Sequence, residues 1–117
     1  NSDVCFLGAR RDEETFHPEI YMNTLPDDVD GADVIVLDPM VATGGSLLHA
    51  LRVIAASGAG TITAVSVLAS PEGVAAIESS GVDGQLFVGF VDDGLNDSAF
   101  IVPGLGDAGD RQFGKIN

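Results

Sequence analysis

The stretch from Val34 to Ser46 carries the residues best suited to chemistry, in the order V-I-V-L-D-P-M-V-A-T-G-G-S. Its four aliphatic residues predict a buried strand that ends at Asp38, and a short loop with Thr43, Gly44 and Gly45 leads into an amphipathic run. Glycines let a ligand approach the backbone, and the free N–H groups at a helix start attract anions. The loop therefore suits a phosphate, and the Asp38 carboxylate suits a pair of sugar hydroxyls.

The loop is not a P-loop, because no Lys follows Gly45 and the first required glycine is missing. T-G-G-S alone would also fit a plain strand-to-helix turn. The whole nonapeptide D-P-M-V-A-T-G-G-S, however, resembles the ribose-5-phosphate loop of uracil phosphoribosyltransferases, with Val41 where that loop usually has Leu. Three further segments resemble the family in order and spacing, namely R-D-E-E-T from Arg11, S-P-E-G from Ser70 and I-V-P-G-L-G-D-A-G-D-R from Ile101.

The resemblance implies catalytic roles for Asp38, Asp107 and Arg11. Arg11 would contact pyrophosphate from a mobile loop, since a planar guanidinium suits that group, with Arg10 a weaker candidate. Without the resemblance, an arginine in an acidic loop is typically part of a solvated ion pair. The residues implied to bind 5-phosphoribosyl 1-pyrophosphate (PRPP) are Arg11, Asp38, Pro39, Met40, Val41, Ala42, Thr43, Gly44, Gly45, Ser46 and Asp107.

The glycine-rich segment after Phe100 is the base site that the resemblance implies. Main-chain groups of Ile101 and Gly106 would bond the pyrimidine edge, and Asp107 would lie near the ribose and pyrophosphate. Mg²⁺ would be held by PRPP and reach Asp107 through water. Phe100 stands where the family has Tyr, so a ring is kept and a hydroxyl is lost. The implied uracil-binding residues are Ile101, Gly106, Asp107 and Ala108. No general base for uracil N1 is identified.

Other patterns have plainer explanations. The glycines of G-x-G-x-x-G would need a following helix and an acidic residue about 20 positions on to mark a dinucleotide site, and the chain ends too soon. The aspartates near residue 95 match no EF-hand and are interpreted as solvated surface. We expect an inert, buried thiol and non-catalytic histidines. These residues are Gly104, Gly106 and Gly109; Asp92, Asp93 and Asp97; Cys5; and His17 and His49.

The periodicity predicts an α/β fold with a parallel, doubly wound sheet, whose ligands collect at the carboxyl ends of the strands. We expect strands at 4–9, 34–37, 61–69 and 85–91, a loop or hairpin at 10–26, and a mostly irregular segment at 93–117 with an extended piece at 100–102. One helix would run from Ser46 to a stop at Gly58, and another from Pro71, capped by Ser70, to Gly81. The resemblance makes this a type I phosphoribosyltransferase-like sheet flanked by helices, in one domain spanning 1–117.

The charge and composition of the chain limit the classes of molecule that it is expected to bind. Eighteen acidic and five basic residues give a net charge of −13, which argues against nucleic acid and anionic membranes as partners. A polyanionic substrate would need local backbone N–H groups, a metal ion or arginines. No apolar run reaches membrane-spanning length, and with a single cysteine this favours the cytoplasm.

The resemblance implies pyrimidine salvage, in which uracil and PRPP give UMP and pyrophosphate. It also implies homo-oligomers and GTP as an allosteric effector. We expect the chain to be the C-terminal portion of such an enzyme, incomplete on its N-terminal side, without the L-R-A-G-type loop and with little activity alone. A phosphoribosyltransferase for another base and a non-catalytic regulator that keeps the ligand loop are the alternatives.

Overall fold

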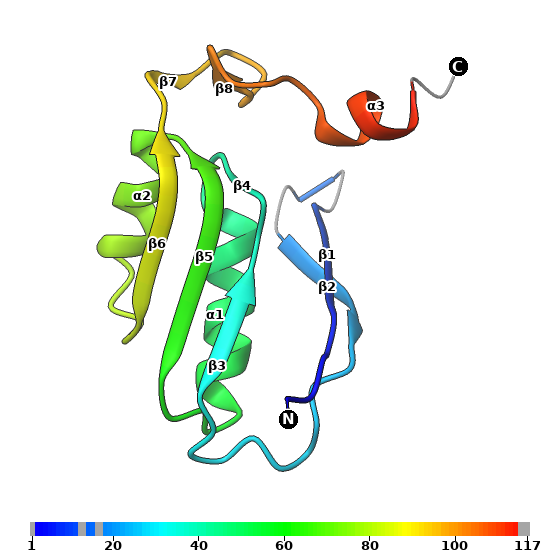
Figure 1. Cartoon of the computed structure of the whole chain (residues 1–117), viewed down its shortest axis with the longest axis vertical. Coiled ribbons are helices and arrows are strands. Elements are labelled where there is room, and N and C mark those ends of the chain that lie inside the picture. Colours follow the sequence, from blue (N-terminus) through cyan, green and yellow to red (C-terminus); the bar gives the residue numbers. More distant parts are fainter. Residues whose placement is uncertain (1, 12–13, 16–17, 115–117) are drawn as a thin grey trace.

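The computed structural model describes residues 2–11, 14–15 and 18–114 (Figure 1). Four parallel strands form the main sheet, and short antiparallel ribbons lie beside it and across its upper end. In chain order the elements are β1 (Leu7–Arg11), β2 (Pro18–Asn23), β3 (Val34–Leu37), β4 (Met40–Val41), α1 (Gly45–Ala56), β5 (Ile62–Ala69), α2 (Pro71–Glu78), β6 (Gln85–Val91), β7 (Gly94–Leu95), β8 (Ile101–Val102) and α3 (Ala108–Phe113).

Strand β5 is the centre of the main sheet. β3 pairs with its first half and β4 with its second half along one edge, and β6 pairs with the other edge. Between β3 and β4 the carbonyl of Pro39 still accepts from the N–H groups of Val67 and Leu68, at 3.1 and 3.2 Å. The β3–β4 segment therefore follows β5 along its whole length, with Asp38 at the break.

Helices α1 and α2 cover the same face of this sheet (Figure 1). The chain moves from β4 through α1 to β5, and then through α2 to β6, so both crossovers advance in one direction. Right-handed crossovers that advance in one direction place their helices on one face. The core beneath them consists of Val41, Leu47, Leu51, Ile54, Ile62, Ala64 and Ala69.

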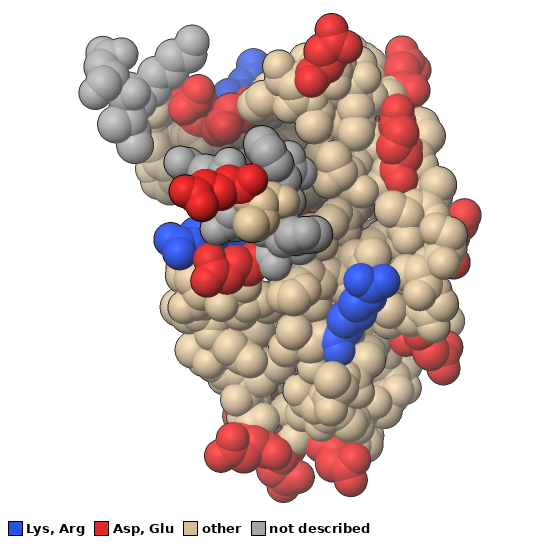
Figure 2. All heavy atoms as spheres, turned by 180° about the vertical axis from the view of Figure 1, so that it is seen from behind, with Lys and Arg blue, Asp and Glu red and all other residues tan. Residues whose placement is uncertain are grey.

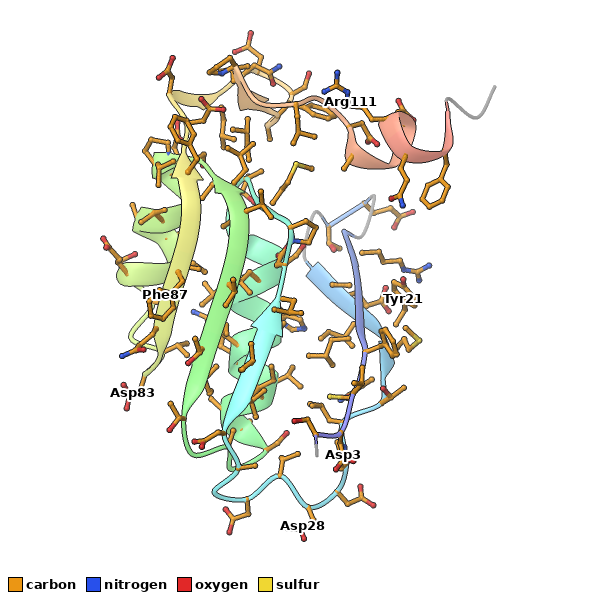
Figure 3. All side chains as sticks on the ribbon, in the orientation of Figure 1. Asp3, Tyr21, Asp28, Asp83, Phe87 and Arg111 are labelled. Atoms are coloured by element: carbon orange, nitrogen blue, oxygen red, sulfur yellow. The ribbon has the colours of Figure 1, made fainter. Side chains whose placement is uncertain are left out.

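The predicted doubly wound arrangement differs from what the described residues form, because they place no helix on the opposite face. That face leaves large apolar side chains in solvent, from Leu37 at 77% exposed to Val65 at 39%. Phe87 projects from β6 on this side (Figure 3). The exposed sheet face comprises Ile35, Leu37, Val65, Val67 and Phe87.

The helix boundaries agree with the capping signals in the sequence. α2 begins at Pro71, and Ser70 accepts a hydrogen bond from Gly73 N at 2.9 Å. After α1, Gly58 has a φ of 86°, the left-handed conformation expected of a glycine stop. None of the helices in the described part of the chain is long and apolar enough to cross a membrane.

The predictions at the two ends of the chain were less accurate. The first strand is β1, which begins three residues later than expected. The 10–26 segment, expected to be a loop or hairpin, supplies the end of β1 and all of β2 in an antiparallel hairpin. The irregular 93–117 segment contains β7, β8 and α3, of which only the extended piece at 100–102 was expected. These elements are short, so they carry little periodicity.

Leu51→Ala should lower the free energy of unfolding by about 2–5 kcal/mol, because Leu51 is 4% exposed in the core and its truncation leaves a cavity. Leu37→Ala, on the exposed sheet face, is the matched control and should change stability by only about 0.5 kcal/mol. Urea denaturation of both variants measures the difference. A loss at Leu37 as large as that at Leu51 would contradict an open face.

Candidate active site

A cavity of about 180 Å³ lies where the β4–α1 stretch meets the glycine-rich segment that follows β7. It joins residues from the two predicted substrate sites, because Met40 and Ala42 come from the phosphate loop while the rest come from residues 94–113, called the base segment below. A larger cavity of about 480 Å³, between the helices and β6, includes none of the predicted residues. The smaller cavity is lined by Met40, Ala42, Ala99, Phe100, Ile101, Leu105, Gly106, Asp107 and Ala108.

Asp38 lies at the carboxyl end of β3, as predicted, and is half-buried. Its Oδ1 accepts a hydrogen bond from Met40 N at 3.3 Å. Burial raises the pKa of Asp38 above its ordinary value, and this hydrogen bond opposes the rise. The carboxylate is thus held at the strand end by its own turn, with its charge poorly solvated.

The phosphate loop turns sharply into α1. Gly44 has a φ of 82°, and a Cβ there would lie 3.0 Å from the carbonyl oxygen of Gly73. Gly45 N lies 3.4 Å from Thr43 Oγ1, which closes the turn. The first turn of α1 carries no acidic side chain, so its N-terminal N–H groups present an uncompensated positive end to an anion.

Ser70 holds the phosphate loop against the N-terminus of α2. Its Oγ donates to the carbonyl of Ala42 at 2.5 Å and also accepts from Gly73 N at 2.9 Å, and the residue is fully buried. A Cβ on Gly73 would lie 2.5 Å from Ala42 O, so only glycine lets α2 approach so closely. The sequence predicted the cap but not the bond to Ala42, which joins positions 28 residues apart.

The base segment begins with the narrow β7–β8 ribbon, closed by Asn96. The Asn96 Oδ1 accepts from the N–H groups of Ser98 and Phe100, both at 3.0 Å. After β8 the chain passes through a cis Val102–Pro103 bond and turns at Gly104, where φ is 53°. Phe100 is 44% exposed and lines the cavity.

Asp107 and Ala108 form the far wall of the cavity. Asp107 is exposed and caps α3, its Oδ1 accepting from Asp110 N at 2.8 Å. No cluster of three or more His, Cys, Asp or Glu side chains suited to a metal ion occurs within the described ranges.

Asp92 corrects the interpretation of the aspartates near residue 95. Asp93 and Asp97 are exposed, as predicted, but Asp92 is only 8% exposed, and its Oδ2 accepts from Gly104 N at 2.8 Å. The solvated reading of Asp92 is wrong because the chain folds back over the end of β6. The signal available in sequence was its position directly after a predicted apolar strand.

Of the two arginines predicted to contact pyrophosphate, the structure describes the side chain of Arg10 only. Arg11 is the last residue of β1, and its side chain lies outside what the structure describes. Arg10 is exposed and pairs with Glu19, with Nε and Nη2 each 3.2 Å from Oε2, which is a solvated ion pair. Acidic side chains are spread along the rim of the face in Figure 2, where Lys and Arg are few.

Of the residues expected to be structural, two are described. Cys5 is half-buried rather than fully buried, and His49 is half-buried on α1. His17 lies outside the described residues, as do Asp12 and Glu13 of the R-D-E-E-T segment.

Comparison with known proteins places these features in a family context. A family model described as uracil phosphoribosyltransferase matches residues 1–115. Over all 117 residues the chain is 50% identical to a uracil phosphoribosyltransferase of Corynebacterium diphtheriae and 48% identical to one of Corynebacterium efficiens, covering 56% of each. A solved structure of the AQ2163 protein from Aquifex aeolicus is 46% identical, with a TM-score of 0.86, over 95% of this chain and 53% of that one. The chain thus spans about half the length of these relatives.

Asp38→Asn should make the protein more stable at pH 7. The raised pKa means that the folded state disfavours the carboxylate, and Asn keeps an oxygen for Met40 N. The unfolded value is near 3.8, so the destabilisation of the wild type is absent below that pH and develops as pH rises through the folded pKa. Urea denaturation at pH 7 and pH 3.5 measures the gap between variant and wild type.

The control for the lost negative charge is Asp27→Asn at an exposed position. A stability gap for Asp38→Asn that is the same at both pH values would contradict the burial effect, as would a less stable variant at pH 7.

Proposed function

Because this chain belongs to the uracil phosphoribosyltransferase family, we propose that it transfers the phosphoribosyl group of PRPP to uracil in pyrimidine salvage. The bond from uracil N1 to ribose C1′ forms, the bond from C1′ to the pyrophosphate oxygen breaks, and the N1 proton is lost. UMP and pyrophosphate are the products. This is the activity that the relatives' names carry, applied to a chain that spans 56% of their length.

One observation carries the proposal. The cavity between β4 and the base segment is lined by Met40 and Ala42 on one side and by Ile101, Gly106 and Asp107 on the other. A base in this cavity would lie directly beside the turn that enters α1. The two reacting centres would then be held by neighbouring walls of one cavity, which is what a group transfer between two ligands requires.

Each part of PRPP has a matching feature. The 5-phosphate would bind the α1 N-terminus and the loop at Thr43–Ser46, where backbone N–H groups and the helix dipole favour an anion. Asp38 would accept hydrogen bonds from the ribose hydroxyls, since an ionised carboxylate is an acceptor only. The transition state has oxocarbenium character, so positioning and charge stabilisation supply most of the rate, and no nucleophilic side chain is needed.

Mg²⁺ is proposed as the partner of the pyrophosphate. The described residues offer isolated carboxylates rather than a cage, and Mg²⁺ is commonly bound by one or two carboxylates together with substrate phosphates. Asp107, through its Oδ2 and a water, is the residue we assign to it. When bound, the ion would neutralise charge on the leaving pyrophosphate, a task that Arg11 would share.

Wider properties follow from the same proposal. Association into homo-oligomers is carried over from the family resemblance, and the exposed sheet face is apolar surface that a second copy or the rest of a longer chain would cover. The free thiol of Cys5 supports a cytoplasmic location. Sensitivity to GTP is carried over from the family resemblance alone.

Gly45→Val should weaken PRPP binding at least tenfold and change stability little. A Cβ at Gly45 would meet only Thr43 Oγ1 at an ordinary 3.6 Å, so the fold has room for it, whereas a branched side chain obstructs the approach of a phosphate to the backbone. Calorimetric titration with PRPP and urea denaturation give the two numbers. Ala56→Val, exposed at the other end of α1, is the control and should bind normally. Unchanged affinity in Gly45→Val would remove this loop from the phosphate site.

UMP formation from uracil and PRPP, by this chain completed to the length of its relatives, is the direct test of function, and cytosine should be a far poorer substrate. Uracil presents an N3–H donor between two carbonyl acceptors, and cytosine presents an amine and a bare N3. A fixed main-chain edge at Ile101 and Gly106 that fits uracil leaves unpaired groups with cytosine, a mismatch that discriminates strongly. Comparable rates with both bases would contradict the base site.

Binding of PRPP without turnover of any base would indicate the regulator instead. Turnover of a base other than uracil would indicate a sister transferase.

A further inference from the structure

The base segment lies outside the main sheet, so its position depends on a few contacts with the end of β6. Asp93 N donates to Val102 O at 3.1 Å, and the β7–β8 ribbon pairs Gly94 with Val102 and Leu95 with Ile101. These contacts hold the outer side of the segment. The turn at residues 103–106, which reaches the cavity through Leu105 and Gly106, is past the end of that ribbon.

Asp92 is the side chain that holds this turn. It directly follows β6, and its backbone N–H donates to Ala69 O at 2.9 Å, which fixes it to β5. Its Oδ2 accepts from Gly104 N at 2.8 Å, across 12 residues of sequence. The carboxylate therefore links the central strand of the sheet to the turn of the base segment through a charge-assisted hydrogen bond, which is shorter and stronger than a neutral one.

The turn is shaped so that Gly104 can receive this contact. Its φ of 53° is in the left-handed region, and a Cβ there would lie 2.1 Å from Ile101 O. The turn therefore folds back on Ile101, which is 8% exposed and lines the cavity. A shift of Gly104 would move Ile101 O and the following Gly106 together, because they belong to one tight turn.

A nearly buried carboxylate is costly unless its hydrogen bonds compensate for lost water. Asp92 is 8% exposed, while its neighbours Asp93 and Asp97 extend into solvent. An exposed aspartate would serve solubility and net charge equally well, so neither explains why Asp92 is buried. The hydrogen bond from Gly104 N explains it, since a main-chain N–H in a tight turn has few other partners.

We propose that Asp92 is a positioning residue for the base site, which holds the Ile101–Gly106 turn at a fixed distance from the β4–α1 loop. That the Ile101–Gly106 turn binds a base rests on the proposed function, whereas the hydrogen bond from Gly104 N to Asp92 is independent of it. Removing the bond should loosen the turn while the phosphate loop, which is held by Ser70, stays in place. The effect should thus fall on the base and not on PRPP.

Steady-state kinetics of the chain completed to the length of its relatives test this assignment. Asp92→Ala should raise KM for uracil about tenfold or more, the size expected for a lost hydrogen bond to a charged group, and change KM for PRPP less than about twofold. Asp92→Asn keeps an acceptor oxygen and should restore most of the uracil affinity. Gly104→Ala disrupts the same contact from the other side and should reproduce the Asp92→Ala pattern.

The matched control is Asp93→Ala, which removes the same charge from the next residue and leaves its main-chain bond to Val102 intact. It should leave both KM values unchanged. Equal rises in both KM values in Asp92→Ala, with no rescue by Asp92→Asn, would assign Asp92 a purely structural role and overturn the proposal.

Hydrogen exchange at the Gly104 amide gives a readout that does not depend on turnover. Exchange should accelerate at least tenfold in Asp92→Ala relative to the wild type, and by less in Asp92→Asn. Unchanged exchange would overturn the proposal even if the wild type forms UMP. Conversely, if the chain completed to the length of its relatives forms no UMP but shows the exchange effect, the proposed function is refuted and the positioning contact stands.

Discussion

The close approach of α2 to the phosphate loop is the contact on which the site geometry depends. Gly73 lies so near Ala42 that no Cβ fits, Gly44 lies against Gly73 in a left-handed conformation, and Ser70 bonds both partners. The loop therefore takes its shape from a helix that follows it by one full crossover. Because the contact consists of backbone atoms and one hydroxyl, it has little freedom to adapt, and rigid placement of N–H groups is what an anion site needs.

The base segment is attached on a different principle. Its own elements are two-residue strands and a six-residue helix, too short to be stable alone, and its exposed side chains contribute little core. Two side chains stabilise the segment by hydrogen bonds. Asn96 accepts from Phe100 N and closes the ribbon, and Asp92 accepts from Gly104 N in the turn. The two halves of the site thus differ in stiffness, since one is packed into the core and the other is tied by polar bonds at the sheet end.

The sequence predicted the central part of the fold well because that part has strong local signals. β3, β5 and β6 are apolar or β-branched runs, Ser70 and Pro71 mark a helix start, and Gly58 marks a stop. Motif likeness placed the phosphate loop and the base segment in one site, although no periodicity connects them. What the sequence could not show is contact between distant positions, such as Ser70 with Ala42 or Asp92 with Gly104. Nor could it show α3, whose only local signal is a capping aspartate at position 107.

The strands themselves carry a further argument about the open face. β3 is apolar at every position, and β5 alternates buried residues with Val65 and Val67, so the helix-free side is as apolar as a core side. Parallel sheets with continuous apolar strands are typically covered on both faces, whereas a solvated face would show polar alternation. The sequence of the strands is thus that of a two-sided sheet, while the crossovers of this chain place helices on one side only. The apolar residues of the uncovered side are consequently the part of this surface best suited to contact with another polypeptide.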